Sequence, residues 1–176
     1  MKKRLQRQDG FTLVELLIVV AIIGIIASIG VAQVLRARLV ANETSAIGSM
    51  RTVNSAQMSY SASAGQGGFA TALATLGSPC PGGTTAFIAA ELNPAAPSAT
   101  PAGASGLLKS GYVVDMTGNG IAGPGDCNGN VTNGNYVATA VPRSVGASGD
   151  RGFNTNGSGT IFFDTAGLGT GTTPIQ

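Results

Sequence analysis

An apolar segment near the N-terminus restricts the possible folds of this chain more than any other feature. The run from Leu16 to Val34 contains 19 residues without a charged side chain, which is long enough to cross the hydrocarbon core of a bilayer as a helix. One carboxylate, Glu15, directly precedes this run. Because a charge inside a membrane span costs about 2.5–3.5 kcal/mol, such a side chain normally has a partner and a purpose.

The residues before the apolar segment are basic. Two lysines and two arginines outweigh the single Asp9 in residues 1–10, and such charges stay on the cytoplasmic side of a membrane, which places the C-terminal part outside. The apolar run exceeds the 7–15 residues of a secretory signal peptide core. A plain signal anchor would explain the length and the orientation, but it gives no reason for Glu15 or for the junction between Gly10 and Phe11.

The hexapeptide GFTLVE from Gly10 to Glu15, followed by an apolar helix, resembles the class III leader of type IV pilins and pseudopilins. The resemblance implies that a prepilin peptidase cuts after Gly10 and methylates the amine of Phe11. It also implies that Glu15 guides the docking of subunits into a homo-oligomeric filament, on an assembly platform in the inner membrane. The resemblance is strongest over residues 1 to about 60, and it implies no cofactor.

The pattern predicts one long helix from Phe11 to about Ala64 in two parts. Residues 11–34 are apolar on all faces, whereas residues 35–64 are amphipathic and continue into the head. Apolar residues of the second part recur at three- or four-residue spacing, namely Ala46, Met50, Val53, Ala56 or Gln57, and Tyr60. The second part should therefore pack under a sheet, while the first part needs lipid or other copies of itself.

Two glycines mark the weak points of the apolar part. Many type IV pilins carry a proline where this chain has Ala32, so Gly24 and Gly30 are the residues that would loosen the helix here. Each costs about 1 kcal/mol relative to alanine in a helix interior. We expect any bend or melting on assembly to fall between them.

Residues 65–176 are expected to form a loop-rich head, so that the chain as a whole is an α+β protein. Turn residues begin at Gly65, and the stretch 93–106 is a low-complexity loop of Ala, Pro, Ser, Thr and Gly. The segments with the composition of strands are 110–116, 135–141, 152–155 and 160–164. They predict a mostly antiparallel sheet of four strands over the apolar stripe of the helix.

Cys80 and Cys127 are the two cysteines of the chain. An even number in a segment expected outside the cytoplasm indicates a disulfide, which would stabilise the head by about 4 kcal/mol in the chain-entropy model. Two free thiols are the alternative. A catalytic cysteine is disfavoured, because the chain has no histidine to activate it.

Other chemistry is sparse. Asp126, Asn128 and Asn130 alternate in a Gly/Asn-rich loop and resemble a fragment of a calcium loop without its later bidentate Glu, although a plain turn is the simpler interpretation. Removal of residues 1–10 leaves six basic and seven acidic side chains, so no basic patch favours nucleic acid. Asp150 and Arg151 are interpreted as surface charges.

The sequence therefore predicts a structural subunit of a type IV pilus-like filament rather than an enzyme. Its precursor would be a single-pass inner-membrane protein with its C-terminus outside the cytoplasm, and the assembled form would be an extracellular pilus or a periplasmic pseudopilus. The alternatives are a pseudopilin of a type II secretion system and a minor pilin that acts in adhesion or DNA uptake.

Overall fold

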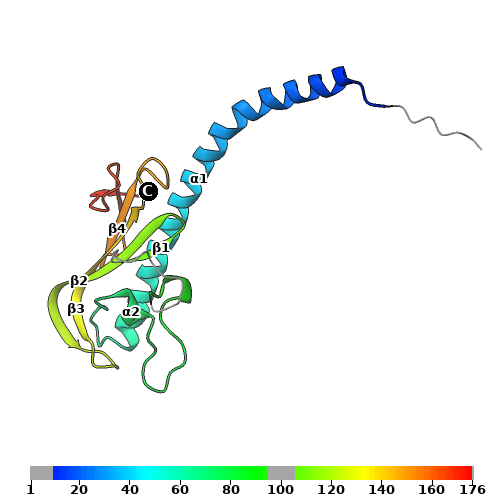
Figure 1. The fold of residues 1–176 in the computed structure, drawn as a ribbon. Helices are drawn as coiled ribbons and strands as arrows, with labels where there is room; N and C mark the ends of the chain where they lie inside the picture. Colours follow the sequence, from blue (N-terminus) through cyan, green and yellow to red (C-terminus); the bar gives the residue numbers. More distant parts are fainter. Residues whose placement is uncertain (1–9, 95–105, 176) are drawn as a thin grey trace, which may run out of the picture. The chain divides into compact units, whose positions relative to one another are not determined.

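The computed structural model describes residues 10–94 and 106–175 (Figure 1). The leader before Gly10 and most of the low-complexity loop lie outside these ranges. The elements are α1 (Leu13–Ser63), α2 (Leu73–Leu76), η1 (Ala90–Leu92), β1 (Leu107–Lys109), β2 (Tyr112–Gly125), β3 (Val131–Pro142), β4 (Gly152–Asn156), β5 (Ile161–Asp164) and β6 (Thr173–Pro174). The chain divides into two units after Ala37, and each is described by itself.

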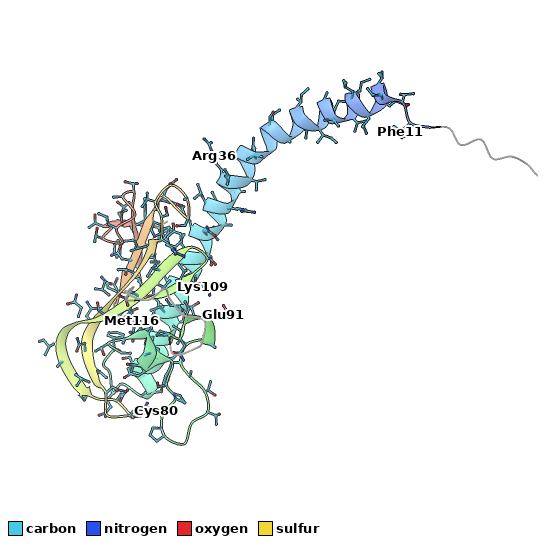
Figure 2. All side chains as sticks on the ribbon, viewed as in Figure 1. Phe11, Arg36, Cys80, Glu91, Lys109 and Met116 are labelled. Carbon is cyan, nitrogen blue, oxygen red and sulfur yellow. A yellow bond between two sulfur atoms is a disulfide. The ribbon has the colours of Figure 1, made fainter. Side chains whose placement is uncertain are left out.

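The N-terminal unit contains the first half of α1. Its described side chains are all exposed from Gly10 to Ala37, although most of them are large and apolar. Between Phe11 and Arg36 they project from the helix without a neighbouring layer in this unit (Figure 2). This part of α1 has the length and composition of a membrane span.

The head, from Arg38 onward, is built on the second half of α1. The predicted stripe is buried: Met50 and Val53 are fully covered, and Tyr60 is 1% exposed. Gln57 belongs to the same face and is also fully buried. Its side chain bonds both the N–H and the carbonyl oxygen of Ala70 at 2.9 Å, which satisfies its amide and fixes the segment that follows the helix.

The sheet is an antiparallel meander in the order β1-β2-β3-β4-β5-β6. One face packs on α1 through alternate residues such as Tyr112, Val114 and Met116 of β2, which are all buried. This arrangement confirms the predicted α+β class and the long helix against an antiparallel sheet. The cluster of buried apolar residues comes from α1, the sheet and the connecting loop together.

The predicted count of four strands is wrong, because the sheet has six. The additional strands, β1 and β6, are three and two residues long, too short to carry an alternating pattern of their own. Their pairing partners define them: Leu108 lies opposite Val113, and Phe163 lies opposite Thr173.

Two strands are also longer than expected. β2 continues to Gly125 and β3 starts at Val131, although glycines interrupt their pattern. The pairing between them contains register shifts after Asn119 and after Ala122, as expected where glycines permit bulges. The result is a β2–β3 hairpin that runs beyond the part of β3 paired with β4.

Candidate assembly site at the start of the helix

The first turn of α1 contains a reciprocal capping interaction between Thr12 and Glu15. The helix starts at Leu13, so Thr12 is the N-cap and Glu15 is the third helical residue. The backbone N–H of Thr12 donates to Glu15 Oε2 at 2.9 Å, and the Thr12 hydroxyl donates to the same oxygen at 2.7 Å. The backbone N–H of Glu15 in turn donates to Thr12 Oγ1 at 3.2 Å. This is the capping box that Thr-x-x-Glu forms at a helix start.

The capping box gives the Glu15 carboxylate a defined place. It sits where the helix dipole favours negative charge, and it contacts the N–H of the residue that directly follows Phe11. The carboxylate is thus held at the Phe11–Thr12 peptide group, one residue after the predicted cleavage position. Sequence analysis singled out Glu15 but missed Thr12, although the spacing of a capping box was visible in the residues TLVE.

The helix surface around the first turns of α1 is apolar and open. Leu13, Leu16, Leu17 and Val20 line a shallow depression on the helix surface, and Phe11 is 82% exposed. An exposed apolar surface of this extent is typical of a membrane or protein contact rather than of a solvated face. The described unit contains no other element that could cover it.

Comparison with known proteins identifies this region. The family model of the prokaryotic N-terminal methylation motif matches residues 5–31. The motif is the one found in the class III leader of type IV pilins and pseudopilins. This motif supports a type IV pilin-like or pseudopilin protein, and it implies processing by a prepilin peptidase and pilus-type assembly in general. No curated protein and no solved structure matches the chain.

The methylation motif ends in the apolar half of α1 and does not reach the head. Gly24 and Gly30 both lie within the matched residues, and α1 is helical through both of them. A Cβ at either position would meet no heavy atom within 4 Å. Packing inside the subunit therefore does not require glycine at either position.

The two cysteines of the head form a disulfide. It joins Cys80, in the loop after α2, to Cys127, in the turn between β2 and β3, with a Cα–Cα distance of 5.5 Å. The bond ties the end of the long hairpin to the loop that connects α1 to the sheet (Figure 2 labels Cys80).

Asp126, next to this disulfide, accepts the hydrogen bonds that hold the turn in which the sequence suggested a calcium site. The structure brings Asp126, Asn128 and Asn130 together, but the two asparagines act as donors. Their backbone N–H groups lie 2.8 and 2.7 Å from Asp126 Oδ1, while Asn130 Nδ2 lies 3.0 Å from Oδ2. The Tyr60 hydroxyl also donates to Oδ2 at 2.8 Å. Both oxygens therefore hold protein donors, and the described residues contain no group of three or more His, Cys, Asp or Glu side chains that could hold a metal ion.

Burial and hydrogen bonds act in opposite directions on the pKa of Asp126 in this turn. Desolvation on its own would raise the pKa of Asp126, which is 8% exposed, but hydrogen bonds from Asn130, Tyr60 and Asn128 outweigh it and hold the pKa below the usual value. Burial, followed by the hydrogen bond to the Asp126 carboxylate, raises the pKa of Tyr60 well above its usual value. The pair is consequently a tyrosine donor on an ionised aspartate, which pins the β2–β3 turn to α1.

Proposed function

We propose that this protein is a structural subunit of a type IV pilus-like filament. A prepilin peptidase removes residues 1–10 and methylates the amine of Phe11. Before assembly, the processed subunit is anchored in the inner membrane with its head outside the cytoplasm. The inner-membrane assembly platform adds it to a filament through its apolar helix. The filament is an extracellular pilus in this proposal, with the periplasmic pseudopilus as the alternative.

One observation carries the proposal: a capped carboxylate stands at the start of an apolar helix half on which no described side chain is buried. In water this half would expose a contiguous apolar surface, which is unfavourable by about 25 cal/mol per Å². Lipid covers it before assembly, and the helices of other copies cover it in the filament. The same surface thus serves for storage and for assembly.

Glu15 has the central role in the assembly step. Within the subunit its carboxylate is held by Thr12, and cleavage creates a positive amine at Phe11. In the filament, the carboxylate of one copy pairs with the Phe11 amine of the next copy. Loss of one partner would leave an uncompensated charge among packed apolar helices, which is strongly destabilising.

The experiment that tests this proposal is mass spectrometry of material sheared from cells. We expect an N-terminal peptide that begins with N-methylated Phe11, recovered from fibres. Glu15→Ala should leave this cleavage intact and abolish the fibres, whereas Glu91→Ala, a substitution of an exposed head carboxylate, should affect neither. A peptide that starts at Met1, or normal fibres from Glu15→Ala, would refute the proposal.

A further inference from the structure

The head contains three Asn-x-Ser/Thr sequences, which begin at Asn42, Asn130 and Asn156. This tripeptide is the acceptor of N-linked glycans on surface loops of exported proteins. The glycan is attached to the side-chain nitrogen of the asparagine, and the hydroxyl of the third residue is part of the acceptor. The hydrogen bonds of these two groups therefore distinguish the three sequences.

The first sequence lies within α1, and both of its groups are engaged. Asn42 Nδ2 donates to the Ser148 carbonyl oxygen at 2.9 Å, which holds the β3–β4 loop to the helix. The Thr44 hydroxyl donates to the carbonyl oxygen of Val40, also at 2.9 Å. Because residues two apart on a helix do not face each other, this hydroxyl does not approach the amide of Asn42.

The second sequence lies where the β2–β3 turn enters β3, and its groups are engaged as well. Asn130 Nδ2 lies 3.0 Å from Asp126 Oδ2, and the Thr132 hydroxyl donates to the Pro124 carbonyl oxygen at 2.7 Å. Thr132 is also fully buried. An enzyme could not reach its hydroxyl in the folded head.

The third sequence, Asn156-Gly157-Ser158, leads from β4 to β5 and has a different arrangement. Asn156 Oδ1 accepts the backbone N–H of Ser158 at 2.9 Å and the Ser158 hydroxyl at 2.7 Å. Because a backbone N–H can only donate, the atom that it meets is the amide oxygen, and the other terminal atom is Nδ2. Within the described parts of the chain, Asn156 Nδ2 donates no hydrogen bond. Ser158 and Gly159 are exposed, so the turn lies at the surface.

We propose that Asn156 is the attachment site of an N-linked glycan. The co-reactant is an oligosaccharide linked through pyrophosphate to a membrane polyprenol. A transferase forms a bond between Nδ2 and the anomeric carbon of the sugar, and the bond between that carbon and the pyrophosphate oxygen breaks. The lipid pyrophosphate leaves with the electron pair, and Nδ2 loses one proton to a base of the transferase. This inference rests on the proposed function, because it needs the head outside the cytoplasm.

The hydrogen bonds at Oδ1 favour this reaction at Nδ2. An amide nitrogen is a weak nucleophile, because its lone pair is delocalised toward the carbonyl oxygen. Two donors on Oδ1 stabilise negative charge on that oxygen, so the N–H group becomes more acidic and the nitrogen more reactive once its proton is lost. In the sequences at Asn42 and Asn130 the hydroxyl is bonded to a backbone carbonyl instead.

The alternation of side chains along β4 directs Asn156 away from α1. Thr155 is fully buried and donates its hydroxyl to Oδ1 of Asn54, a residue of α1, at 3.0 Å. Successive side chains of a strand point to opposite faces, so Asn156 shares the other face with Val137, its partner in β3. A glycan at this position therefore lies on the side of the sheet that is turned away from the helix.

Mass spectrometry of the processed full-length protein from its host, taken from both fibres and membranes, tests the site. Trypsin cuts after Arg151, and no Lys or Arg follows, so residues 152–176 form one peptide with one Asn-x-Ser/Thr sequence. We expect this peptide to carry a glycan that fragmentation places on Asn156. Asn156→Gln and Ser158→Ala should each reduce the modified fraction at least tenfold, whereas Ser158→Thr should retain it. Asn154→Gln is the matched control, and it should leave the modified fraction unchanged.

The outcomes separate this site from the proposed function. An unmodified 152–176 peptide from the wild type would overturn the glycan while leaving the filament subunit intact. So would a glycan that persists in Asn156→Gln, since it would then be attached to a hydroxyl of the same peptide. An N-terminal peptide that starts at Met1 would instead count against the proposed function.

Discussion

Arg151 and Glu43 form a two-point ion pair that joins the start of β4 to α1. Nε and Nη2 of Arg151 lie 2.9 and 2.6 Å from Glu43 Oε2. The other oxygen of Glu43 accepts the backbone N–H groups of Asp150 and Arg151 at 3.1 and 3.2 Å. The interpretation of Arg151 as a surface charge is therefore wrong, because this guanidinium satisfies a carboxylate that is 7% exposed.

Aromatic rings complete the environment of this ion pair. The guanidinium carbon of Arg151 lies 5.7 Å from the ring centre of Phe153 and 5.5 Å from that of Phe163. A planar cation over such rings gains a further attraction. The sheet is thus attached to α1 at Glu43 by charge, in addition to the apolar packing farther along the helix.

Removal of Arg151 should destabilise the head substantially. In Arg151→Ala the buried Glu43 carboxylate loses its cation, and we expect the free energy of unfolding to fall by about 2–3 kcal/mol, below the 3–5 kcal/mol of a fully buried pair because the arginine is partly exposed. Urea unfolding of the full-length protein in detergent, followed by circular dichroism, measures the loss. The matched control is Lys109→Ala, which breaks a pair whose carboxylate partner, Glu91, is 76% exposed, and it should cost less than about 1 kcal/mol. Equal losses in both variants would contradict this role of Arg151.

The stability of the head should fall in acid. Burial would raise the pKa of Glu43, but the hydrogen bonds and the charge of Arg151 and the N–H of Asp150 hold it below the usual 4.5. The pKa of Asp126 is likewise held below its usual 3.8, as described above. A lowered pKa in the folded state contributes stability above the unfolded value and loses it as pH falls through the folded value. Unfolding free energies measured from pH 7 down to pH 2.5 should therefore be level to about pH 5 and then decline.

Asp126→Asn separates the contribution of the aspartate. An amide keeps one acceptor for the backbone N–H groups, but it no longer titrates and its NH₂ group opposes the donors from Tyr60 and Asn130. We expect a lower stability at pH 7 and a shallower decline below pH 5. An unchanged acid profile would show that Asp126 does not contribute to the pH dependence.

The disulfide should add several kcal/mol to the head. In the chain-entropy model a bond across 47 residues contributes about 4 kcal/mol, and measured losses on removal of native disulfides are about 2–5 kcal/mol. The double variant Cys80→Ala with Cys127→Ala should have a lower midpoint of thermal unfolding than the oxidised wild type. A reductant should lower the midpoint of the wild type but leave that of the double variant unchanged. Tyr60–Asp126 and the pairing of β2 with β3 remain, so the fold itself should persist. A thermal midpoint equal to that of the oxidised wild type would contradict this expectation.

Local chemistry explains which features the sequence could predict. The GFTLVE motif, the apolar run after it and the buried stripe around Met50 and Val53 depend on neighbouring residues, so their signals lie within short windows. The pairing of Arg151 leaves no signal in a short window, because its partner Glu43 lies 108 residues away in the chain. The same holds for the glycine-rich end of β2, whose strand conformation depends on pairing with β3 rather than on its own composition.

The capping box leads to a prediction that separates the two tasks of Glu15. Thr12→Ala removes the N-cap hydroxyl, which should destabilise the first turn of α1 by about 1 kcal/mol, but it leaves the carboxylate available for the Phe11 amine. We therefore expect Thr12→Ala to be cleaved and to form fewer fibres, Thr12→Ser to assemble as the wild type does, and Glu15→Gln to form none. Glu15→Gln retains an oxygen that can accept the N–H of Thr12, so its failure would isolate the charge from the cap. Quantitative immunoblots of sheared fibres against total processed subunit measure all three variants, and fibres at wild-type levels from Glu15→Gln would assign the whole effect of this residue to helix capping.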